Sequence, residues 1–264
     1  MNEILKEKEI SVNYNEIFTT LPRQKEKSIA LLGEKYSEVC NCLNLLNFII
    51  DCIEPGFTKS SEIILSIAGK MVKNIVSSYF LFLHGFYQEA NQVLRNVFEL
   101  CLISIEISHN EEKLNEWSKI EPPSFERARQ KQETPFAAGK INNRIQQGKQ
   151  YNAYFKSLSN DTIENWRNAS NLAAHEFYAK STKGYYGRKN SVLISNVIED
   201  KNKLIEENNV YKGLIWNIIQ ILVRTQELDN KLPQDKLKFV AQRMDSLFKD
   251  ILNSKNMKIT SQAK

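Results

Sequence analysis

Apolar residues recur every three or four positions through most of this chain, which is the spacing of amphipathic helices. The pattern predicts main helices over about residues 23–54, 60–84, 86–109, 161–178, 201–229 and 234–252. The helix at 86–109 is apolar nearly all round in its second half, so we expect it at the centre of a bundle. The predicted fold is an all-α, single-domain helical bundle.

The predicted bundle domain covers residues 23–254, between a polar N-terminal arm (1–22) that ends at Pro22 and a tail at 255–264. A basic, irregular insertion at about 122–159 interrupts the helical pattern, and we interpret it as two short helices and a loop. Val192, Leu193 and Ile194 are ambiguous between a short strand and the start of a helix.

Composition narrows the class of protein. The 264 residues include 36 Lys and Arg against 31 Asp and Glu, a net charge of +5, and only 9 Gly and 6 Pro. So little Gly and Pro argues against collagen-like, linker-rich and turn-rich all-β architectures. The sequence has no apolar run of membrane-spanning length and no signal-peptide core, and its four Cys include no C-x-x-C pair. We therefore expect a reduced, cytoplasmic protein.

The common catalytic and cofactor motifs are absent. The sequence contains no phosphate loop, no dinucleotide-binding G-x-G-x-x-G and no G-x-S-x-G or H-E-x-x-H. It also lacks the paired Glu-x-x-His of four-helix di-iron proteins. We expect neither a metal nor a cofactor.

The first candidate site is a pair of opposite charges, Arg95 and Glu99, on the most apolar predicted helix. Residues four apart share one face of a helix. Charges on an otherwise buried helix are costly unless they meet each other or a ligand. The pair is therefore either a buried ion pair that fixes helix packing or part of a ligand site.

The second candidate site is a polar stripe on the predicted helix at 161–178. Arg167, Asn171 and His175 follow at four-residue intervals along one side of the helix, with Ser170 beside them. An imidazole transfers a proton near neutral pH, and a guanidinium binds a phosphate through two hydrogen bonds. The stripe predicts a phosphodiester-binding site. The alternative is a histidine held by a neighbour at a helix–helix contact.

Two parts of the sequence resemble known families. The segments GFYQEA at 85–90, LR at 94–95 and FE at 98–99, with a Ser and a His on a later helix, resemble a group of bacterial all-helical proteins. The stretch from Arg167 to His175 is similar to the HEPN superfamily of helical-bundle nucleases and nucleotide-binding modules. The signature of that superfamily is an Arg, a polar residue (here Asn168) and, a few positions on, a His.

The resemblance implies a metal-independent endoribonuclease. His175 would help to activate a ribose 2′-hydroxyl and Arg167 would stabilise the phosphate, which leaves a cyclic phosphate end. The seven residues between them exceed the usual spacing of the family, so Arg95 is an alternative partner for His175. The supporting residues would be Arg95, Glu99, Asn168, Ser170 and Asn171. HEPN modules usually dimerise, and many belong to toxin–antitoxin or phage-defence systems, which implies a homodimer and a protein partner such as an antitoxin.

Basic and aromatic side chains on both sides of the polar stripe favour RNA as the ligand. Aromatic rings stack on bases and cations follow the phosphates of a single strand. The predicted RNA-binding residues are Arg127, Arg129, Lys183, Tyr185, Tyr186, Arg188 and Lys189. The alternative is a solvated basic face without a ligand.

Three functions remain open from the sequence. The first is a HEPN-like endoribonuclease or RNA-binding effector. The second is a non-catalytic helical interaction or regulatory protein, and the third is a bundle that binds a nucleotide or another small anion.

Overall fold

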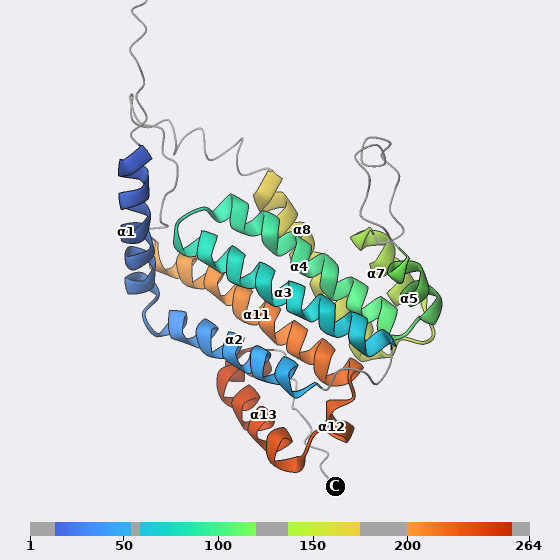
Figure 1. Ribbon diagram of the computed structural model, residues 1–264. Helices are drawn as coiled ribbons and strands as arrows, with labels where there is room; N and C mark the ends of the chain where they lie inside the picture. Colours follow the sequence, from blue (N-terminus) through green and yellow to red (C-terminus); the bar gives the residue numbers. More distant parts are fainter. Residues whose placement is uncertain (1–13, 54–58, 120–136, 175–199, 255–264) are drawn as a thin grey trace, which may run out of the picture.

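The computed structural model describes residues 14–53, 59–119, 137–174 and 200–254, and their regular structure is entirely helical (Figure 1). The helices are α1 (Tyr14–Leu32), α2 (Glu34–Cys52), α3 (Lys59–Leu83), α4 (Tyr87–Ser108), α5 (Glu111–Ser118), α7 (Ala138–Gln147), α8 (Ala153–Ala174), α11 (Lys201–Thr225), α12 (Leu228–Lys231), α13 (Gln234–Leu247) and α14 (Lys249–Ser254). The prediction of an all-α bundle is confirmed.

The centre of the bundle is α4, as the sequence predicts. Every residue from 100 to 107 is buried, because α3, α8, α11, α5 and α7 surround this half of the helix. Figure 1 shows the long helices α2, α11, α3 and α4 side by side, with α1 crossing one end and α5 and α7 at the other. A helix that is apolar on all sides is stable only when others cover it on all sides.

Helices α3 and α4 form a hairpin through a tight turn at Gly85. Gly85 has φ +82°, a conformation that residues with a Cβ rarely adopt. The backbone N–H of Phe86 donates to the carbonyl of Leu81 at 2.9 Å and closes the turn. The sequence-based prediction of a break near Gly85 is confirmed.

The N-terminal boundaries differ from the prediction. A helix already runs from Tyr14 and includes Pro22, which was expected to end the polar arm. Proline fixes φ near the helical value and removes one backbone donor, so a long helix can continue through it at a cost. The predicted helix at 23–54 is instead divided at Gly33, whose φ of +56° separates α1 from α2.

Helix α8 begins eight residues earlier than predicted. Asp161, the first residue of the predicted helix at 161–178, lies inside α8, and the Asn152 side chain accepts a hydrogen bond from the backbone N–H of Phe155 at 3.0 Å. Asn is as good an N-cap as Asp, so the first suitable residue after the turn begins the helix. The predicted helix at 234–252 is also divided, because Phe248 leaves helical geometry between α13 and α14.

Several predictions fall outside the described residues. They concern much of the basic insertion (120–136), the ambiguous Val192–Leu193–Ile194 segment within 175–199, and the tail at 255–264.

Candidate functional site

The first predicted site, Arg95 and Glu99 on α4, meets Trp166 of α8, the residue that precedes Arg167 of the second predicted site. Trp166 of α8 donates its indole N–H to Oε1 of Glu99 on α4 at 2.9 Å. The Nε of Arg95 lies 3.4 Å from the same carboxylate oxygen. The Arg95 guanidinium also lies over the Trp166 ring, with its Cζ 5.8 Å from the ring centroid. Arg95, Glu99 and Trp166 therefore form one cluster, called here the α4–α8 cluster.

The charges of this cluster face solvent. The side chain of Arg95 is 49% exposed and that of Glu99 is 31% exposed, so the option of a buried ion pair is wrong. The reason lies in the helix: α4 is covered on all sides only from residue 100 onward, and Arg95 lies on its half-covered first part. An exposed pair contributes little to stability, whereas a guanidinium on an aromatic face remains able to bind an anion.

Arg167 and Asn168 follow Trp166 and are exposed on the outer side of α8. Ser170 differs, because its Oγ is buried and has no hydrogen-bond partner among the described residues. A buried hydroxyl without a partner is costly. Arg95 therefore contacts Trp166 directly, and Arg167 follows Trp166 in the sequence with an exposed side chain.

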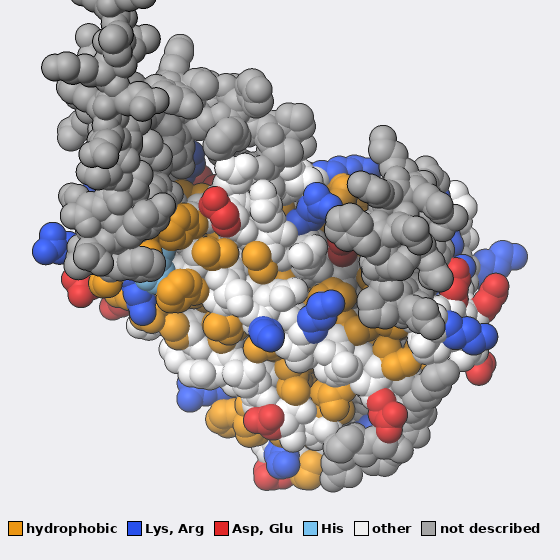
Figure 2. Space-filling view, turned by 45° about the horizontal axis from the view of Figure 1, so that its top comes forward, with side chains coloured by type: hydrophobic (Ala, Val, Ile, Leu, Met, Phe, Trp, Pro, Cys, Tyr) orange, Lys and Arg blue, Asp and Glu red, His pale blue; other side chains and the backbone are white. Residues whose placement is uncertain are grey.

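His175 and all the predicted RNA-binding residues lie outside the described part of the chain. Helix α8 ends at Ala174, and His175 lies outside the described residues, as do Arg127, Arg129, Lys183, Tyr185, Tyr186, Arg188 and Lys189. The backbone of Asn171 is helical, but its side chain is not described. On the face in Figure 2, Lys and Arg are scattered singly among apolar and uncharged side chains.

The sequence analysis missed a second charged pair, between Glu106 on α4 and Arg144 on α7. Glu106 is fully buried, and Arg144 donates to it twice, from Nε at 2.5 Å and from Nη2 at 2.9 Å. The hydrogen bond to Glu106 raises the pKa of Arg144. The sequence does contain a signal for this pair. Glu106 is the acid in the apolar half of the predicted helix at 86–109, and a buried acid requires a cation from another helix.

His109 lies close to this second pair, where α4 ends. Its ring packs on Phe155 and Tyr151, with centroids 4.4 and 5.5 Å apart. Its Nδ1 lies 2.7 Å from the Ser108 hydroxyl and 3.2 Å from the carbonyl of Ile105. Burial lowers the pKa of His109, which favours the neutral form of the ring. These contacts indicate a structural role for His109 at the C-terminal end of α4.

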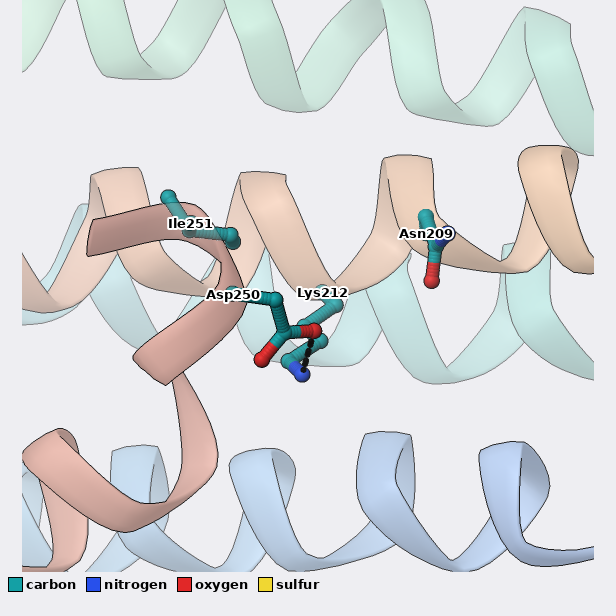
Figure 3. Close-up of a pocket in the computed structure, with 4 residues that line it drawn as sticks. All are labelled: Asn209, Lys212, Asp250 and Ile251. Carbon is teal, nitrogen blue, oxygen red and sulfur yellow. Dashed lines mark hydrogen bonds and ion pairs between the residues drawn. The ribbon is translucent and has the colours of Figure 1, made fainter. Parts of the chain in front are cut away.

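A small open pocket of about 210 Å³ lies elsewhere, between α11 and α14. Figure 3 shows its lining residues, Asn209 and Lys212 from α11 and Asp250 and Ile251 from α14. The ammonium of Lys212 is nearly buried and lies 2.8 Å from Asp250 and 3.1 Å from Glu38 of α2. Burial opposes the charge, but the two carboxylates outweigh it and raise the pKa of Lys212.

Among the described residues, no group of three or more His, Cys, Asp or Glu side chains is arranged to hold a metal ion. Within the same ranges, no helix is long and apolar enough to cross a membrane. Comparisons with protein-family models, curated proteins and solved structures found no match for the chain.

The α4–α8 cluster has the chemistry of an anion- and base-binding surface. Arg95 contacts Glu99 through Nε, and no partner within the described ranges is shown for its terminal nitrogens. Two hydrogen bonds from such a group fit a phosphate. The guanidinium plane over an indole also provides a surface on which an unpaired base stacks.

Proposed function

We propose that this chain binds single-stranded RNA and cleaves it as a HEPN-like, metal-independent endoribonuclease of the cytoplasm. The observation that carries the proposal is the α4–α8 cluster, in which Arg95 and Trp166 meet from two helices, next to the exposed Arg167. Phosphate and base recognition both require groups of this kind on an open surface.

In the proposed reaction, the imidazole of His175 accepts the proton of a ribose 2′-hydroxyl. The 2′-oxygen attacks the adjacent phosphorus and the bond from phosphorus to the 5′-oxygen of the next nucleotide breaks. That oxygen takes a proton from solvent, to which His175 returns the proton it accepted. The products are a 2′,3′-cyclic phosphate and a 5′-hydroxyl. Arg167 hydrogen-bonds the phosphate and offsets the charge that develops on it. Arg95 positions the strand by binding a neighbouring phosphate.

The proposal assigns the supporting roles to residues on both helices near Trp166. Glu99 accepts the indole N–H and holds the ring against Arg95. In the proposal, Asn168 on α8, together with Asn171, completes the polar side that faces the strand. Ser170 supports this side from within the helix contact, because its Oγ is buried. A homodimer with a protein partner such as an antitoxin, in a toxin or phage-defence role, belongs to the same proposal.

The test is cleavage of a single-stranded RNA oligonucleotide by the full chain in excess EDTA. We expect wild-type protein to cut, and Arg167→Ala and His175→Ala to lose activity by at least about a hundredfold, the usual contribution of acid–base catalysis. The matched control is Arg243→Ala on α13, an exposed arginine that lies over the Phe239 ring, far from α8. Equal cleavage by all variants, or no cleavage by the wild type, contradicts the proposal.

The second candidate is a non-catalytic interaction or regulatory protein. Val76 and Phe80 favour it, because they lie one turn apart on α3 and are 51% and 56% exposed. Adjacent exposed apolar side chains are a common feature of protein-binding surfaces. If the wild-type protein neither binds nor cuts RNA, the result favours this second candidate.

A further inference from the structure

Helices α12, α13 and α14 (residues 228–254) form a C-terminal unit, called here the C-terminal arm, outside the main bundle. Figure 1 shows α12 and α13 below α2 and α11. Of the fourteen residues of α13, only Val240 and Met244 are buried. A helix held by so few apolar contacts opens more easily than the core.

The junction between α11 and the arm carries two unfavourable features. Glu227 has φ 52° and ψ 44°, the left-handed conformation that a residue with a Cβ adopts at a cost. Its neighbour Gln226 is 2% exposed, and its Nε2 has no hydrogen-bond partner in the described part of the chain. Each feature costs free energy in this conformation, so the junction is a weak point between α11 and the arm.

The arm is held against the bundle by its buried side chains Leu228, Val240 and Met244, and by ring and charge contacts. Phe248 is fully buried and packs on Trp216 of α11, with ring centroids 5.0 Å apart. Phe239 meets Phe48 of α2 edge-on, also at 5.0 Å. Asp250 accepts a hydrogen bond from Lys212 at 2.8 Å.

The ion pair is the contact most easily broken. Asp250 is 61% exposed, whereas Lys212 beneath it is only 4% exposed. If the arm leaves, Lys212 keeps Glu38 as a partner, and Glu38 is also bound by Lys35 at 2.7 Å. Release of the arm therefore leaves no unpaired buried charge in the bundle, which lowers the free energy needed for opening.

We propose that the C-terminal arm is a hinged cover that opens as a unit at Gln226–Glu227 while the bundle stays folded. Lys212–Asp250 is its latch. The pocket beside Lys212 lies at the seam, because α11 and the arm each contribute two of its lining residues (Figure 3). Opening exposes the Lys212 ammonium together with the apolar faces of Phe48 and Trp216. The inference is independent of the proposed RNase activity.

The test is native-state hydrogen exchange of the full chain, followed by mass spectrometry of peptides from 228–254 and from α4. In wild-type protein we expect the arm to exchange faster than α4, since it opens without global unfolding. Asp250→Asn removes the charge of the latch and should accelerate exchange of the arm about twofold to fivefold, the scale of a partly exposed ion pair. Glu227→Gly relieves the left-handed strain and should slow it about twofold.

The matched control is Asp245→Asn, an exposed aspartate on α13. It should leave the exchange of the arm unchanged. The proposal is overturned if the arm and α4 exchange in step in the wild type, if Asp245→Asn acts like Asp250→Asn, or if neither Asp250→Asn nor Glu227→Gly changes the rate.

Discussion

At the scale of single residues, Arg95 connects α4 to α8 through Trp166, the residue next to Arg167. Its guanidinium lies between the Glu99 carboxylate and the Trp166 ring, and half of its side chain is exposed. Glu99 is itself held by the indole N–H. Such an arginine is held by two neighbours and is still half exposed to solvent, which suits a phosphate-binding role.

Replacing Arg95 tests that role. Arg95→Ala should weaken binding of a single-stranded RNA oligonucleotide about fivefold and lower the slope of log K against log salt concentration by about 0.7, the value for one lost phosphate contact. Fluorescence anisotropy at several salt concentrations measures both quantities. Arg243→Ala should change neither. An Arg95→Ala protein with wild-type affinity and slope removes Arg95 from the RNA surface.

At the scale of elements, two buried charges join helices that are distant in sequence. Glu106 joins α4 to α7, and Lys212 joins α11 to α2 and α14. Among the described residues these are the only buried Asp, Glu, Lys or Arg side chains. Each charge requires its partner, because an unpaired charge in this environment is strongly destabilising.

Removal of Arg144 should show how much an unpaired Glu106 destabilises the protein. Arg144→Met leaves the Glu106 carboxylate without its main partner and should lower the free energy of unfolding by about 2–4 kcal/mol in urea denaturation. Lys149→Met, an exposed cation just after α7, should change it by less than about 0.5 kcal/mol. The double variant Glu106→Leu/Arg144→Met should recover most of the loss. Similar values for Arg144→Met and Lys149→Met would rule out the structural role.

The contacts of Lys212 with Glu38 and Asp250 predict that the stability of the protein depends on pH. Partial burial opposes ionisation of Glu38 and Asp250, but hydrogen bonds from Lys35 and Lys212 to Glu38, and from Lys212 to Asp250, lower the pKa of both carboxyls. A lowered pKa in the folded state stabilises the protein above the unfolded value, about 4, and this contribution is lost as the pH falls through the folded value.

We therefore expect the melting temperature to fall below about pH 4 and to fall less steeply in Asp250→Asn than in wild type. Thermal melts from pH 7 to pH 3 measure this difference. Asp235→Asn on α13 is the control and should follow the wild-type curve. Parallel curves for all three proteins would show that the Asp250 carboxyl does not contribute.

At the scale of the whole molecule, α4 is the helix around which the others assemble. Ile105 has no exposed surface and lies where α4 is covered on all sides. Ile105→Ala should lower the free energy of unfolding by about 2–5 kcal/mol, because it leaves a cavity in a packed core. Val76→Ala removes a similar side chain from the surface of α3 and should cost less than about 0.5 kcal/mol. If both variants lose the same free energy of unfolding in urea denaturation, α4 is not the centre of the core.

The sequence predicts the fold better than the site. Apolar spacing identifies α3, α4 and α11, because burial repeats with the helical period. Apolar spacing does not predict the division at Gly33 or the start of α8 directly after Asn152. Local backbone conformation and capping, not periodicity, determine those boundaries. The meeting of Arg95 with Trp166 depends on how α4 packs against α8, and no local pattern contains that information.

The most direct measurement of the proposed activity is the fate of one phosphodiester in EDTA. An RNA oligonucleotide and the same oligonucleotide with a single 2′-deoxyribose at the cut position are incubated with the full chain, and mass spectrometry identifies the product ends. The account predicts cleavage of the first only, with a 2′,3′-cyclic phosphate and a 5′-hydroxyl, and none with His175→Ala. Cleavage of the 2′-deoxy substrate at that position, or undiminished cleavage by His175→Ala, would contradict it.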